Sequence, residues 1–112
     1  GDKIMAQKIV DISKYINNDA PQMVLFGKTY TVKNDKKTIL LLNDIQSKAN
    51  DDADEKIIKL LVGKEDGAEI CRIINENANY NENTKIIMLN LLALATGQDY
   101  EALEERFQNA TK

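Results

Sequence analysis

The sequence of 112 residues contains no histidine, no tryptophan and a single cysteine, Cys71. Without histidine, the chain lacks the side chain that most often serves as a general base or a metal ligand near neutral pH. One cysteine can form no internal disulfide and cannot supply the usual ligands of a structural zinc site. A phosphate-binding loop is also missing, because neither Gly63 nor Gly67 leads into a Gly-Lys-Ser/Thr motif. These absences predict a protein that is not an enzyme and that uses no metal or cofactor.

The acidic segment DDADE at positions 51–55 is the strongest candidate for a metal site. Clustered carboxylates can bind a divalent cation, but an EF-hand loop alternates its ligands over about twelve residues around a central glycine. The segment 51–55 neither alternates its acidic residues over such a length nor contains a glycine. Acidic residues are also favoured in the first turn of a helix by the helix dipole. We therefore interpret positions 51–55 as the beginning of a helix, and Glu101, Glu104 and Glu105 as the solvent face of the last helix.

The net charge of −3 argues against general nucleic-acid binding, for which a basic protein is expected. The charge is unevenly distributed. Residues 1–50 contain eight lysines and five aspartates, a net charge of +3, whereas residues 51–112 contain seven basic and thirteen acidic residues, a net charge of −6. The asymmetry has two interpretations: helix-capping acids gathered by chance, or head-to-tail self-association of basic and acidic halves.

Hydrophobic residues make up 43% of the chain, enough for one core, and the length predicts a single domain over residues 1–112. The longest apolar stretch, 86–95, is interrupted only by Asn90 and is too short to cross a membrane, which takes about 20 residues. The first residues show no apolar leader of the kind found in signal peptides. Together with the lone cysteine, this pattern predicts a cytoplasmic protein.

The first 33 residues divide into a lead-in and a β-hairpin. In the lead-in, 1–21, Ile9, Ile12 and Ile16 have the spacing of a short amphipathic helix, which could pack on the domain or on a partner. Residues 22–33 alternate β-forming side chains around Gly27-Lys28, which predicts a type II′ turn at these two positions. If the register is regular, we expect Val24, Phe26, Tyr30 and Val32 to share one face of the hairpin.

The remainder, 34–112, predicts about five short helices packed around a central apolar helix, so the fold class is α+β and mainly α. Capping residues and glycines delimit the helices. The first is expected from Asp35 to about Ala49, and the next two from Asp52 to Gly63 and from Glu65 to Glu76. The asparagine-rich segment 75–83 is expected to be a loop. The apolar central helix then ends at Gly97, and an amphipathic helix follows Asp99.

Two motifs and the overall character of the chain together resemble the tail assembly chaperones of siphovirus-type bacteriophages and prophages of Gram-positive bacteria. The first motif is FGKTYTV followed at once by a helix of the type ILLLNDIQ. The second is NTKIIMLNLLALATGQDYEALEERF, an apolar helix, a glycine stop and a short acidic helix. The third feature is a small, acidic, mainly helical chain. The resemblance spans residues 24–107.

The resemblance implies a chaperone that binds the tape measure protein and keeps it soluble until the tail tube forms. The tail tube protein is a second expected partner, self-association is expected to be weak, and neither nucleic acid nor membrane is expected as a partner. The expected location is the host bacterial cytoplasm. We predict that the hairpin and its neighbouring helix bind the partner through Phe26, Tyr30 and Leu41.

Two other functions fit the same sequence. A structural subunit of the phage particle, such as a connector or a tail-completion protein, would use the hairpin edge and the charge asymmetry to form a ring. A small helical regulator or adaptor is the second alternative. As a DNA reader it would need a basic recognition helix, whereas the helix after Gly97 is acidic.

Overall fold

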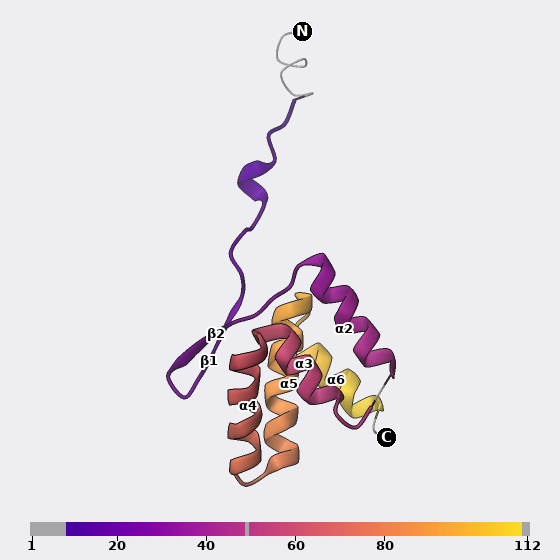
Figure 1. Ribbon diagram of the computed structural model, residues 1–112. Helices are drawn as coiled ribbons and strands as arrows, with labels where there is room; N and C mark the ends of the chain where they lie inside the picture. The colour runs from indigo at the N-terminus through magenta and orange to yellow at the C-terminus, as the bar shows by residue number, and fades with distance from the viewer. Residues whose placement is uncertain (1–8, 49, 111–112) are drawn as a thin grey trace.

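The computed structural model describes residues 9–48 and 50–110, and this part of the chain is mainly helical α+β with a two-stranded antiparallel hairpin followed by five helices (Figure 1). The predicted fold class is confirmed. The elements in chain order are η1 (Ser13–Tyr15), β1 (Gln22–Leu25), β2 (Lys28–Thr31), α2 (Lys36–Lys48), α3 (Ala53–Val62), α4 (Lys64–Glu76), α5 (Tyr80–Thr96) and α6 (Tyr100–Ala110).

Helix α5 is the central element, in contact with α3, α4, α6 and β1. Its inward side chains include Leu91, which is fully buried, whereas its neighbour Leu92 packs only partly against the core. Gly97 ends the helix in the left-handed conformation, as predicted. The helix begins at Tyr80, so the prediction of a loop over 75–83 is wrong except at residues 77–79. Asparagines in that segment lie within helices because their neighbours supply the apolar face that packs.

The predicted turn of the hairpin is wrong by one residue. Leu25 pairs with Lys28, so the two turn residues are Phe26 and Gly27 rather than Gly27 and Lys28. Both have positive φ, 48° and 77°, as a type I′ turn requires. The predicted shared face is wrong for β1 as well, because cross-strand partners lie on the same face and Tyr30 pairs with Met23 rather than with a residue of the Val24 and Phe26 set. Met23 and Leu25 therefore face the core beside Tyr30, and Val24 is exposed.

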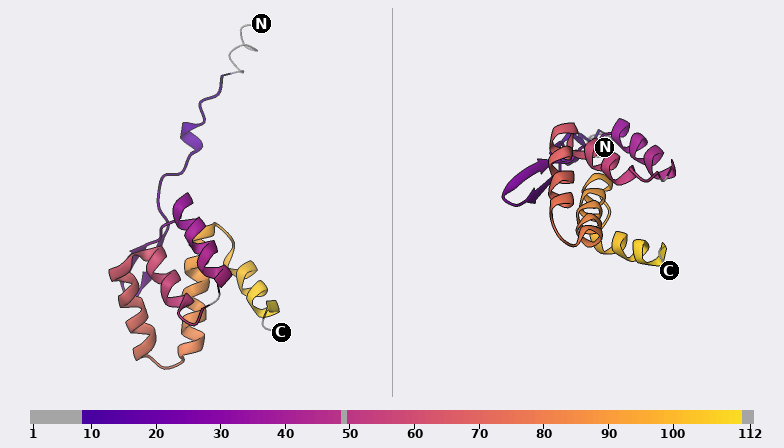
Figure 2. Two further views of the ribbon diagram at one scale, coloured as in Figure 1. Left: turned by 45° about the vertical axis from the view of Figure 1, so that its right-hand side comes forward. Right: turned by 60° about the horizontal axis from the view of Figure 1, so that its bottom comes forward.

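The lead-in does not form the predicted amphipathic helix. Its only helical element among residues 9–21 is the single turn η1, and the segment runs away from the helical body in Figure 1 and in the left view of Figure 2. The side chains of Ile9, Ile12 and Ile16 are exposed. An isolated helix this short is marginal in water, and in one chain the apolar stripe has nothing to pack against.

Helices α3 and α4 approach each other closely at Gly67. A Cβ atom at position 67 would lie 2.6 Å from the Cα atom of Lys59, closer than packed atoms come. Gly67 is buried within α4, so the helix accepts the low helix propensity of glycine to allow this contact. The close contact fixes α4 against the rest of the core.

We predict that Gly67→Ala lowers the free energy of unfolding by about 1–3 kcal/mol, although alanine is the better helix former, because the added methyl group overpacks the α3–α4 contact. Ala68→Gly is the matched control. Residue 68 is exposed in the same helix turn, so this change should cost about 1 kcal/mol through helix propensity alone. Urea denaturation of both variants measures the difference. A stabilised Gly67→Ala variant would show that the two helices do not approach this closely.

Candidate partner-binding groove

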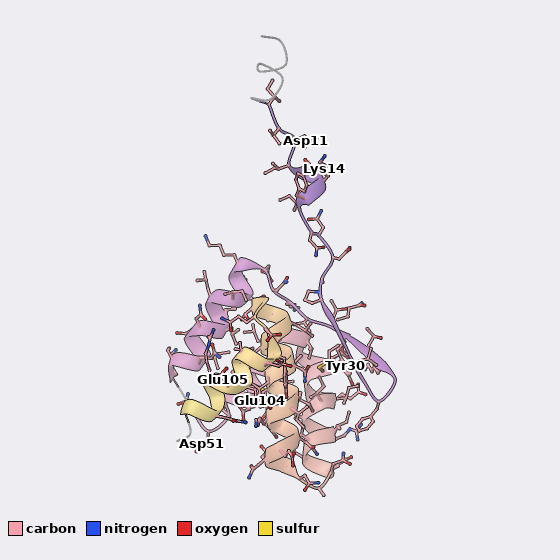
Figure 3. The ribbon with its side chains drawn as sticks, turned by 180° about the vertical axis from the view of Figure 1, so that it is seen from behind. Asp11, Lys14, Tyr30, Asp51, Glu104 and Glu105 are labelled. Atoms are coloured by element: carbon pink, nitrogen blue, oxygen red, sulfur yellow. The ribbon has the colours of Figure 1, made fainter. Side chains whose placement is uncertain are left out.

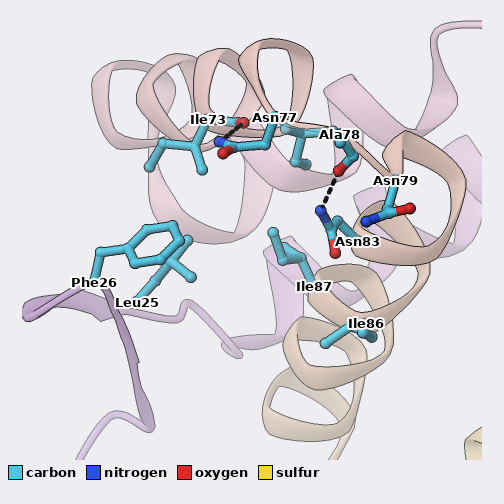
Figure 4. A pocket seen from close by; sticks show the side chains of 10 residues that line it. Leu25, Phe26, Ile73, Asn77, Ala78, Asn79, Asn83, Ile86 and Ile87 are labelled. Carbon is cyan, nitrogen blue, oxygen red and sulfur yellow. Dashed lines mark hydrogen bonds between the residues drawn. The ribbon is translucent and has the colours of Figure 1, made fainter.

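An open groove of about 370 Å³ lies between the turn of the hairpin and the end of the α4–α5 helical pair (Figure 4). Its volume is in the range of sites that bind small ligands or a few side chains of a partner. The lining consists of aliphatic and aromatic side chains with an asparagine-rich margin: Leu25, Phe26, Ile73, Ile74, Asn77, Ala78, Asn79, Asn83, Ile86 and Ile87. An apolar floor with a polar margin is typical of protein-binding surfaces.

Phe26 forms the outer lip of the groove, where it faces Ile73 and Ile87 from the hairpin side (Figure 4). Its side chain is 80% exposed although it is one of only two phenylalanines in the chain. Its φ of 48° is a left-handed conformation that is unfavourable for a bulky residue by about 1–3 kcal/mol. An exposed aromatic ring on a strained turn lowers stability without contributing to the core, which points to a role in binding.

Lys28 fixes the hairpin to α4. Its ammonium group lies 3.2 Å from Asp66 and also pairs with Glu69, both on α4. The same group lies 5.1 Å from the centre of the Tyr30 ring, close enough for a cation–π contact. Hydrogen bonds to Glu69 and Asp66 raise the pKa of Lys28 above its usual value, which reflects the same two ion pairs. The position of Phe26 next to α4 follows from this attachment.

Three asparagines build the margin at the α4–α5 connection. The amide nitrogen of Asn77 donates a hydrogen bond to the carbonyl oxygen of Ile73 at 2.6 Å, and that of Asn83 donates to Ala78 at 2.8 Å (Figure 4). Asn79 has a φ of 64°, a conformation that asparagine tolerates better than most residues. Because their NH₂ groups bond to the backbone, Asn77 and Asn83 keep their side-chain oxygens for N–H groups of a partner.

The structure separates the three residues predicted to bind the partner. Phe26 lies in the groove. Tyr30 is only 1% exposed, between the hairpin and the helices (Figure 3), and burial raises the pKa of its hydroxyl. It is an anchor of the hairpin, and a partner cannot reach it in this fold. Leu41 is 44% exposed on α2, on the other side of the helical body from the hairpin (Figures 1 and 2). With Leu40 it forms a separate apolar patch.

Sequence reasoning missed the wall of the groove that α4 and α5 supply. The apolar stretch 86–95 was expected to lie at the centre of the core, but Ile86 is 43% exposed, and Ile73 on α4 is only partly buried. The sequence signal that could have indicated this wall is the run of apolar residues on all sides of α5. A helix of a small domain has too few neighbours to cover such a run completely, so part of it stays at the surface.

The acidic segment 51–55 forms no metal-binding cluster with its neighbours in the part of the chain that is described. Among residues 9–48 and 50–110, no group of three or more carboxylates and thiols is arranged to hold a metal ion. Asp54 and Glu55 lie in the first turn of α3, where Glu55 pairs with Lys59 at 2.6 Å. Burial raises the pKa of the Cys71 thiol, which lowers its reactivity.

No helix in the described part of the chain combines the length and the apolar character needed to cross a membrane. Comparisons of the chain with family models, with curated proteins and with solved structures found no match.

We predict that Phe26→Asn raises the free energy of unfolding by about 1 kcal/mol, because Asn-Gly is the preferred sequence of a type I′ turn and little packing is lost with an exposed ring. Thermal or urea denaturation measures the change. If the turn were instead Gly27-Lys28, position 26 would belong to a strand, where asparagine is unfavourable, and the variant would be destabilised. Gly27→Ala is the control, and it should be destabilising because its φ of 77° disfavours any side chain.

Proposed function

We propose that this protein is a tail assembly chaperone of a siphovirus-type bacteriophage or prophage, and that its groove binds a helical segment of the tape measure protein. The observation that carries the binding role is Phe26, an exposed aromatic ring held in a strained conformation at the lip of an apolar groove. The identity of the partner rests on the resemblance of residues 24–107 to this family. The host bacterial cytoplasm is the proposed location.

The groove suits one face of an amphipathic helix. Such a helix presents apolar side chains at intervals of three and four residues, and these would contact Phe26, Ile73 and Ile86. Free N–H groups at its end, or polar side chains along its edge, would donate to the oxygens of Asn77 and Asn83. A long helical protein with uncovered apolar stripes aggregates, so covering those stripes would keep it soluble.

A subunit that remains in the phage particle, such as a connector or tail-completion protein, is the second candidate. The observation in its favour is the exposed apolar lead-in, which extends from the body as subunit-linking arms do (Figure 1). A permanent ring needs a large contact, in the range of about 2,000 Å² or more. The lead-in and one small groove supply less, which favours a reversible contact and hence the chaperone.

We predict that Ile86→Asp abolishes the ability of the protein to keep the tape measure protein soluble on co-expression, because the carboxylate would be desolvated against the bound helix. Ile86 is 43% exposed, so the variant should remain folded, and circular dichroism and thermal unfolding check this. Leu41→Asp is the matched control at a similarly exposed leucine on α2, and it should leave solubilisation unchanged. If Leu41→Asp loses activity and Ile86→Asp does not, the binding surface is on α2.

The neighbouring genes test the identity of the partner independently. For a tail assembly chaperone, we expect the DNA just downstream to encode an overlapping frame and then a long protein of helical heptads. Sequencing that region shows whether these neighbouring genes are present. Head and connector genes upstream without a tape measure gene would favour the particle subunit, and neighbours unrelated to phage would remove both candidates.

A further inference from the structure

The lead-in contains a second apolar surface without a partner. Five of the eight side chains in residues 9–16, which we call the arm, are large and apolar, and all five are 57–85% exposed: Ile9, Val10, Ile12, Tyr15 and Ile16. The charged residues of the arm, Asp11 and Lys14, lie far from the helical body (Figure 3). Such a concentration of exposed apolar side chains is unfavourable in water and marks a contact surface.

The arm points away from the groove of its own chain. The hydrogen bond from the amide of Val32 to the carbonyl oxygen of Pro21, at 2.8 Å, continues the hairpin ladder beyond β1. The chain therefore enters the hairpin at the end opposite the Phe26–Gly27 turn, whereas the groove lies at that turn (Figures 1 and 4). To reach its own groove, the arm would have to reverse its direction within the few residues before Pro21.

We propose that the arm of one copy docks in the groove of a second copy, so that copies of this chain associate head to tail. The spacing of Ile9, Ile12 and Ile16 places these side chains on one face once the arm is helical, and an eight-residue helix is about 12 Å long. In the single chain this apolar face is exposed to water, and on docking the groove of the second copy covers it. Ile73 and Ile86 of the second copy then lose their contact with water.

The arm itself is neutral, because Asp11 and Lys14 cancel, and no charged side chain among the described residues lines the groove, so the docked contact is apolar. The two halves of the chain differ in charge, +3 for residues 1–50 and −6 for residues 51–112, so copies approaching head to tail attract each other at low salt. We therefore expect salt to slow the encounter and to change the stability of the docked contact little.

The contact joins two different surfaces, so each copy that uses its arm still offers a free groove. Such contacts build open chains or rings rather than closed two-fold dimers. An eight-residue arm buries less than the roughly 1,200 Å² of a stable complex, so the association is expected to be weak and reversible. The inference needs only this chain and is independent of the tape measure protein.

Two variants test the inference in the full-length protein. The arm variant, Ile12→Asp with Ile16→Asp, keeps its groove, and the groove variant, Ile86→Asp, keeps its arm. All three residues are exposed, so both variants should unfold at temperatures close to that of the original protein. Sedimentation velocity should show a mass that rises with concentration for the original protein and a monomer for each variant alone. An equimolar mixture of the two variants should form a dimer and stop there, because only one matching arm and groove remain.

Three results would overturn the inference. The original protein could stay monomeric up to millimolar concentration, which means that the arm folds back on its own chain or stays free. The groove variant could still associate with itself, which places the docking site elsewhere. The mixture of variants could stay monomeric. Leu41→Asp is the matched control and should associate as the original protein does. Failure to bind the tape measure protein would leave these measurements unaffected.

Discussion

The docking of the hairpin on the helices is the contact on which the rest of the structure depends. A two-stranded hairpin is at best marginally stable alone in water, so its inner face must be covered. Tyr30 and Val32 are buried there, and the amide of Lys33 donates to the carbonyl oxygen of Leu61 at 2.7 Å. Lys28 adds its ion pairs to α4. The hairpin thereby becomes a fixed wall beside the helices instead of a mobile loop.

Fixing the inner face also determines what the turn presents to solvent. With Tyr30 inward, its partner Met23 faces inward too, and the register that pairs these two residues leaves Phe26 and Gly27 as the turn. The ring lies outside the core on a left-handed backbone, in a turn where asparagine would be more stable. Strain of this kind persists only where the surrounding structure imposes it, and it is common at binding surfaces. The inward position of Tyr30 therefore explains both where the groove lies and why the backbone at its lip is strained.

The opposite wall depends on how tightly the helices pack. Gly67 lets α4 lie close to α3, and the chain reverses within Asn77-Ala78-Asn79 so that α5 runs back beside α4. Ile73 and Ile86 then lie on neighbouring helices at one end of the body. Because two helices and a docked hairpin hold the groove, its shape exists before any partner arrives, which lowers the ordering entropy that binding must overcome.

Local signals in the sequence determined the elements. The apolar periodicities, Gly63 and Gly97 as helix ends and the alternation in 22–33 are effects of neighbouring residues, and they predicted the α+β class and the bounds of most helices. The same pattern placed Phe26 on one face with Tyr30 and Val32, whereas the residue lies in the turn.

Contacts between distant residues decided the rest. At the hairpin, packing against the helices decided which face is covered: Tyr30 and Val32 are buried, Met23 and Leu25 pack beside them, and Val24 is left exposed. Tyr30 became an anchor instead of a binding residue, and Ile86 moved from the predicted core to the surface, since burial depends on what the other elements cover. The low helix propensity of Gly67 has its explanation only in the α3 backbone beside it.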